Sequence, residues 1–187
     1  SLMRFSFSRL ALAAGLCAAA AAAQANATYG SFVDVAGSLS FDGWNELNRN
    51  RTGGALTEAE LVAGSGSNVA GSGDALFTRL SGSHYPAGFG LYGSNSVFSF
   101  TDSTIASGTS SLVFQGIIND FDAAFGGAPF TLTLSYNGGS QNLAATTVSS
   151  VLTPGNVEDL YTFRWDLSSL GPVDSYSLAL GAGFSQA

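Results

Sequence analysis

The stretch Phe130-Thr-Leu-Thr-Leu-Ser-Tyr136, followed at once by Asn137-Gly138-Gly139, has the most regular alternation of apolar and hydroxyl side chains in this 187-residue chain. A period of two puts the apolar side chains on one face of a strand and the hydroxyls on the other. Asn-Gly is the strongest short hairpin signal. We therefore predict a half-buried strand over 130–136 and an antiparallel return over Gln141–Ala144.

Further strands are predicted wherever β-branched and aromatic residues cluster between turn-forming residues. Six segments meet this criterion: Ser31–Phe41, Ala75–Leu80, Gly90–Phe100, Ser111–Ile118, Leu160–Leu167 and Ser175–Leu180. Each has one apolar face, and evenly spaced strands without long helices between them are typical of antiparallel sandwiches and jelly rolls. The sequence therefore predicts an all-β, single-domain, antiparallel β-sandwich with a jelly-roll-like arrangement over residues 28–187. Trp44 and Trp165 are expected to anchor the core or a sheet edge.

Helix is expected only at Leu56–Ala63, where Thr57 and Glu60 have the spacing of a capping box. The Gly- and Ser-rich stretch Gly64–Gly73 ends this pattern and predicts a long flexible loop. Neither side of that loop is long enough for a separate domain, so we do not interpret it as an interdomain linker.

The first 27 residues have the pattern of a secretory signal peptide. Arg4 and Arg9 precede and flank an uncharged run, Leu10–Ala23, and two A-x-A sites follow it. We predict cleavage after Ala27 and export of the remainder, to the cell surface or the extracellular space by way of the periplasm. The alternative is a membrane anchor, but the apolar run is shorter than the roughly 20 residues that a spanning helix needs. No membrane span is expected in the mature chain.

Export would leave an acidic chain without cysteine. Cys17 lies in the leader, so disulfides and thiolate metal sites are not expected in the mature protein. Arg4 and Arg9 are two of the six basic residues, so four basic residues face 13 acidic ones, a net charge of −9. Because such a surface repels phosphate, nucleic-acid binding is not expected. With 45% hydrophobic residues, the chain is expected to form a proper core.

No catalytic constellation is evident in the sequence. A hydrolytic triad needs a histidine between a carboxylate and a nucleophile. His84, the single histidine, lies in Ser83-His84-Tyr85-Pro86, which resembles a turn, and no G-x-S-x-G segment is present. We therefore predict that the protein is not an enzyme and has no catalytic residues. A glycan hydrolase that uses two carboxylates about 5–10 Å apart stays open as a third alternative.

Calcium is the one cofactor for which the sequence offers candidate ligands. Asp120 and Asp122 lie on an expected turn and are weak candidates for oxygen ligands, since a calcium loop usually continues with more Asp or Asn residues and a glycine. A solvated turn in which Asp caps its own backbone is the favoured interpretation. Glu158-Asp159 precedes another strand, and Asp34 and Asp42 flank the first one. They would join a site only if the fold brought them close.

Aromatic residues near loops offer a possible sugar-binding surface. Trp44, Tyr85, Phe89 and Tyr92 lie in or near expected loops, where an exposed ring can stack on a sugar ring. In sandwiches most aromatic side chains pack in the core instead. Trp44, Tyr85 and Tyr92 are therefore candidate glycan contacts, with the core as the alternative location.

Several segments of the chain resemble a known class of exported proteins. They are Gly71-Ser72-Gly73-Asp74-Ala75, Tyr85-Pro86 with Gly90-Leu91-Tyr92, Val113-Phe114-Gln115, and Tyr161-Thr-Phe-Arg-Trp-Asp166 with its continuation to Ser175. Together with the leader and the lysine-free body, they resemble the PEP-CTERM/exosortase substrates of Gram-negative, exopolysaccharide-making bacteria. The resemblance covers most of the mature chain and contains no catalytic signature.

The resemblance implies a C-terminal sorting tail with a Pro-Glu-Pro motif, an apolar helix and a basic end. The sequence has no such tail, and we expect that the chain is truncated at its C-terminus. The expected function is that of an exported, non-enzymatic surface or matrix protein, held by extracellular polysaccharide or by neighbouring matrix proteins. A carbohydrate-binding module is the alternative.

Overall fold

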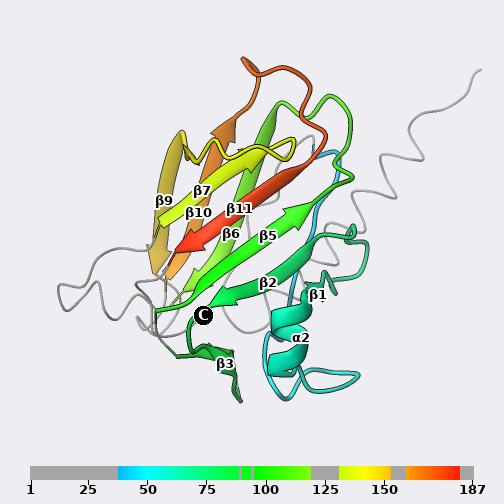
Figure 1. Ribbon diagram of the computed structural model, residues 1–187, viewed down its shortest axis with the longest axis vertical. Helices are drawn as coiled ribbons and strands as arrows, with labels where there is room; N and C mark the ends of the chain where they lie inside the picture. Colours follow the sequence, from blue (N-terminus) through cyan, green and yellow to red (C-terminus); the bar gives the residue numbers. More distant parts are fainter. Residues whose placement is uncertain (1–37, 89, 94, 119–130, 153–158, 182–187) are drawn as a thin grey trace, which may run out of the picture.

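Two antiparallel sheets lie face to face in the computed structural model, which describes residues 38–88, 90–93, 95–118, 131–152 and 159–181 (Figure 1). The larger sheet has six strands in the order β1-β2-β5-β11-β7-β8, and the smaller has three in the order β6-β10-β9. A separate two-stranded sheet, β3-β4, lies near one end of the larger sheet. This arrangement confirms the predicted all-β antiparallel sandwich.

The strands of the larger sheet are β1 (Ser65–Gly66), β2 (Leu76–Ser81), β5 (Val97–Asp102), β11 (Tyr176–Gly181), β7 (Thr131–Tyr136) and β8 (Leu143–Ala144). Those of the smaller sheet are β6 (Ser111–Ile118), β10 (Asp159–Asp166) and β9 (Thr147–Leu152). The hairpin consists of β3 (Tyr85–Pro86) and β4 (Leu91–Tyr92). Only residues 145 and 146 separate β8 from β9, so the chain passes between the sheets there in a very short connection.

Within the alternating stretch, Thr131–Tyr136 form β7 as predicted, and residue 130 lies outside the described residues. Leu132 and Leu134 are buried, while Thr131 is exposed. Asn137 and Gly138 both have positive φ, +50° and +68°, as a tight hairpin turn requires. The return strand is antiparallel, as predicted, but begins at residue 143.

Gln141 explains the late start of the return strand. Its side-chain amide forms both hydrogen bonds to the backbone of Tyr136, accepting from the N–H at 3.0 Å and donating to the carbonyl at 3.2 Å. The side chain thus satisfies the backbone groups that a ladder pair would otherwise use, and the regular pairing is delayed by two residues.

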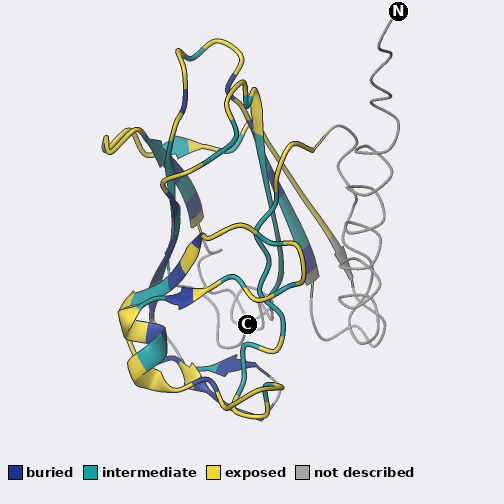
Figure 2. Ribbon diagram, turned by 90° about the vertical axis from the view of Figure 1, so that its right-hand side faces the viewer, coloured by how far each residue is buried: buried dark blue, intermediate teal, exposed yellow. Residues whose placement is uncertain are grey.

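The core lies between the two sheets, which Figure 2 shows edge-on with their buried residues in dark blue. Phe100 of the larger sheet packs on Phe114 of the smaller sheet, with ring centroids 4.9 Å apart. Trp165 is 2% exposed, and its indole N–H donates to the carbonyl of Leu143 in the other sheet at 3.1 Å. Ring packing and a cross-sheet hydrogen bond therefore join the layers, and Trp165 is the core anchor that the sequence predicts.

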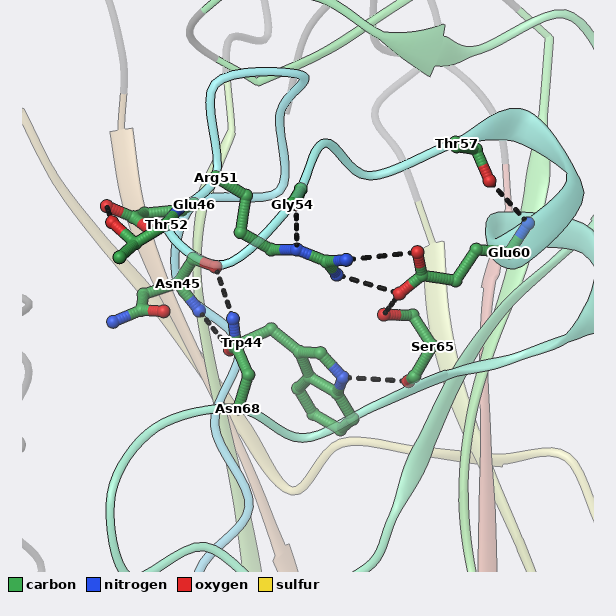
Figure 3. Close-up of polar contacts among 10 residues, drawn as sticks. All are labelled: Trp44, Asn45, Glu46, Arg51, Thr52, Gly54, Thr57, Glu60, Ser65 and Asn68. Atoms are coloured by element: carbon green, nitrogen blue, oxygen red, sulfur yellow. Dashed lines mark hydrogen bonds and ion pairs between the residues drawn. The ribbon is translucent and has the colours of Figure 1, made fainter.

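The helix α2 (Glu58–Ala63) confirms the predicted capping. The Thr57 hydroxyl accepts a hydrogen bond from the Glu60 N–H at 3.1 Å, and Leu61 is fully buried beneath the helix. The Glu60 carboxylate forms a bidentate pair with Arg51 at 2.7 and 3.0 Å (Figure 3). This pair ties the loop before the helix to its first turn and lowers the pKa of Glu60.

Several predicted boundaries are wrong. The single strand expected over 90–100 is divided into β4 and β5, because Gly93 and Asn95 have φ of +151° and +52°, which no strand continues. The loop expected over 64–73 contains β1, which pairs with β2. Residues 38–41 are not in a strand, and residues 31–37 of that predicted strand lie outside the described residues. The strand β9 is not predicted from the sequence at all.

Candidate functional site

The hairpin β3–β4 brings together two of the three candidate glycan contacts. Tyr85 and Tyr92 are directly opposite each other in the antiparallel pair, so their side chains share one face. Tyr85 is 42% exposed and Tyr92 is half-buried. Neither hydroxyl has a hydrogen-bond partner among the described residues. We call Tyr85 and Tyr92 the tyrosine pair.

A rigid base positions the tyrosine pair. His84 precedes Tyr85, and both its backbone N–H and its ring Nδ1 contact the hydroxyl of Ser96, at 3.0 and 2.8 Å. Gly93 follows Tyr92 and lies so close to His84 that a Cβ there would be 2.6 Å from its Cα. The guanidinium of Arg79 also donates to the His84 carbonyl. The two strands of the hairpin are therefore fixed to β5 and β2 at the end nearest the sheet.

His84 itself is fully buried, against the ring of Phe98. Burial lowers the pKa of its imidazole to about 4, and the positive charge of Arg79 acts in the same direction. The ring is therefore neutral at neutral pH and has no access to solvent. A general base must reach the proton that it removes, so this location suits a structural histidine.

Trp44, the third candidate, has contacts with the core. Its ring lies against Phe100 at a centroid distance of 5.5 Å and against Phe77 at 6.2 Å. Its indole N–H donates to the carbonyl of Ser65 at 3.0 Å (Figure 3). The side chain is half-buried, so the structure places Trp44 in the packing between the loop over 42–56 and the larger sheet.

Three aspartates that the sequence analysis did not connect lie near the other end of β2 and β5. Asp42 accepts hydrogen bonds from the Ala75 N–H at 3.1 Å and from the Ser67 hydroxyl at 3.2 Å. Burial raises the pKa of the Asp42 carboxyl; the hydrogen bond from Ala75 opposes this rise, and the charge of Asp102 adds to it. Residue spacing gives no sign of this proximity, because Asp42, Asp74 and Asp102 come from separate elements.

The other predicted positions lie outside the described residues. These are Ala27, Asp34, Phe89, Asp120, Asp122 and Glu158. Within the described residues, no three His, Cys, Asp or Glu side chains are arranged to hold a metal ion. The weak calcium candidates are among the residues that this finding does not cover.

No helix within the described ranges is long and apolar enough to cross a membrane. No protein-family model, curated protein or solved structure matches the chain.

Proposed function

We propose that this chain is an exported, non-enzymatic protein of the cell surface or extracellular matrix, of the PEP-CTERM/exosortase type, that works in association with exopolysaccharide or with matrix proteins. The structural observation that supports the non-enzymatic part of the proposal is the state of His84. The single histidine of the chain is fully buried, neutral and hydrogen-bonded to Ser96, and so is occupied in holding the fold. The leader pattern over residues 1–27 and the excess of acidic residues support export and a role outside the cytoplasm.

Export is tested by expressing the full chain in a Gram-negative host and sequencing the N-terminus of the protein recovered outside the inner membrane. The expected N-terminus is Thr28, following cleavage after Ala27. Replacing the small residues that end both A-x-A sites, in the double variant Ala25→Leu, Ala27→Leu, should leave the precursor uncut, with Ala19→Leu inside the apolar run as the control. Protein recovered outside the inner membrane with residues 1–27 intact would contradict the proposal.

A second candidate function, a carbohydrate-binding module, is favoured by the tyrosine pair. Two half-exposed phenol rings on one face of a fixed hairpin form a surface on which a sugar ring can stack, and their hydroxyls are free of partners within the described residues. Because the hairpin is anchored at its base, little ordering would be needed on binding.

Retention on a panel of insoluble polysaccharides, with and without EDTA, tests this second function. Binding that EDTA leaves unchanged and that Tyr85→Ala weakens by up to about tenfold supports a tyrosine surface, since stacking on an aromatic ring contributes roughly 0.5–1.5 kcal/mol. Val148→Ala, which removes an exposed apolar side chain from the smaller sheet, is the control. Release of new reducing ends from a retained polysaccharide would favour the glycan hydrolase instead. Retention on no polysaccharide would leave association with matrix proteins.

A further inference from the structure

A pocket of about 240 Å³ lies at the end of the larger sheet where β5 and β7 finish and β11 begins (Figure 1). Its floor is a row of side chains from four neighbouring strands, because Leu76 pairs with Thr101, Thr101 with Ser177, and Ser177 with Ser135. The next residues along these strands, among them Phe77 and Phe100, point into the core. By alternation, the row faces outward.

Three hydroxyls therefore stand side by side on the pocket floor. Thr101, Ser177 and Ser135 lie on adjacent strands, which are spaced about 4.8 Å apart. The hydroxyls of Thr101 and Ser177 have no partner among the described residues, and Ser135 accepts a long hydrogen bond of 3.3 Å from the Asn142 N–H. Each of these groups can both donate and accept.

The rim of the pocket adds fixed hydrogen-bond acceptors. Asp74 and Asp102 line it, and both lie within hydrogen-bonding distance of the Thr104 hydroxyl, at 2.6 and 3.1 Å. The Thr104 N–H also donates to the Asp102 carboxylate at 2.7 Å. Gly138 and Gly139, which have no side chains, line the opposite rim with their backbone atoms. The acceptors are therefore held in place before any ligand arrives.

The lining determines which ligands fit. It contains two carboxylates and no Lys, Arg or His, so an anionic ligand would meet uncompensated negative charge. Its apolar side chains are few, with Leu76 at one end of the floor, too little for a lipid or a hydrophobic peptide. The hydroxyls of the floor can both donate and accept hydrogen bonds, and the carboxylates of the rim can only accept them. A molecule rich in hydroxyl groups matches this combination.

We propose that this pocket binds a neutral saccharide, with one sugar ring over the row formed by Thr101, Ser177 and Ser135. The sugar hydroxyls donate to Asp74 and exchange hydrogen bonds with the three side-chain hydroxyls. The site is at the opposite end of β5 from the tyrosine pair and does not depend on it. The proposal rests on the proposed association with polysaccharide and names the class of sugar and the place where it binds, so it can fail while the tyrosine pair still binds.

The test is a titration of the isotope-labelled full chain, followed by the NMR shifts of its backbone amides. The probes are short neutral oligosaccharides of glucose, galactose or mannose, and an oligomer of galacturonic acid as the anionic counterpart. We expect saturable shifts at Ser135, Gly138 and Ser177 with at least one neutral probe, and none with the anionic one. The double variant Thr101→Val, Ser177→Ala should weaken binding by about tenfold or more, since it removes two hydrogen-bonding groups.

The matched control is Thr133→Val, which removes a hydroxyl from the neighbouring row of the same outer face, opposite Ala179. It should change the affinity by less than about twofold. Absence of saturable shifts with every neutral probe, equal binding of the galacturonic acid oligomer, or an equal loss in Thr133→Val would overturn the proposal. Shifts confined to Tyr85 and Tyr92 would also overturn it, while supporting the tyrosine surface.

Discussion

At the scale of single residues, burial of His84 makes the stability of the protein depend on pH. The pKa of its imidazole is about 4 in the folded protein and about 6.5 in an unfolded chain. The unfolded chain therefore binds the proton first as the pH falls, and the folded state loses stability between about pH 6.5 and pH 4, with little further change from this group below pH 4. We expect a loss on the order of 2–3 kcal/mol across that window.

Chemical denaturation at a series of pH values measures this loss, with His84→Gln as the comparison. The variant keeps a hydrogen-bonding side chain but cannot titrate, so the loss between pH 6.5 and pH 4 should be much smaller, whatever its stability at neutral pH. Asp42, whose raised pKa acts with the opposite sign, is present in both proteins and cancels in the difference. The same acid dependence in both proteins would contradict the prediction.

The indole of Trp44 is predicted to stabilise the fold rather than to contact a glycan. Trp44→Phe retains a ring against Phe100 but removes the hydrogen bond to the Ser65 carbonyl, which lies in a residue only 2% exposed. We expect the free energy of unfolding to fall by about 1–2 kcal/mol, because the carbonyl loses its partner. Retention on polysaccharide at a temperature where the variant is folded should not change; its loss would make Trp44 a ligand contact.

At the scale of elements, the base of the tyrosine hairpin depends on close backbone contact. Gly82 has φ of +93°, and a Cβ there would lie 2.3 Å from the Cα of Ser96. Gly53 has nearly the same φ, +88°, with open space around it. Gly53→Ala should therefore cost only the backbone strain, about 1 kcal/mol, and Gly82→Ala clearly more, since backbone atoms must move apart. Thermal unfolding of both variants measures the difference; equal costs would mean that the contact at Gly82 relaxes freely.

Local sequence patterns predict some of the helices and strands but not others. Strands with strict alternation, such as β7, and the capped helix α2 could be predicted because their signals are local. The strand β9, Thr147–Leu152, was missed: its side chains at 147–150 are exposed, and it is a strand because its backbone pairs with β10. The division between β4 and β5 depends on the contact of Gly93 with His84, which no spacing in the sequence reveals.

The candidate sites also depend on pairing between residues that are distant in the chain, which local sequence patterns do not reveal. The sequence singled out Tyr85 and Tyr92 by type, but their opposition depends on the two-residue strands that pair them. The hydroxyl row needs three strands, β5, β11 and β7, that are adjacent in the sheet and distant in the chain. Ser and Thr on strand faces are common, so only the observed strand order brings them together in one pocket.

At the scale of the whole molecule, stability should reside in the packing between the two sheets. Phe163 and Val148 are neighbours on adjacent strands, β10 and β9, and on the same face, but Phe163 is 6% exposed and Val148 is 56% exposed. Phe163 packs against Phe114 and stacks with Trp165, whereas the side chain of Val148 is largely exposed to solvent. We expect Phe163→Ala to reduce the free energy of unfolding by about 3–5 kcal/mol and Val148→Ala by less than about 1 kcal/mol. Equilibrium denaturation of the two variants measures both values, and similar losses would show that the sheets do not pack as described.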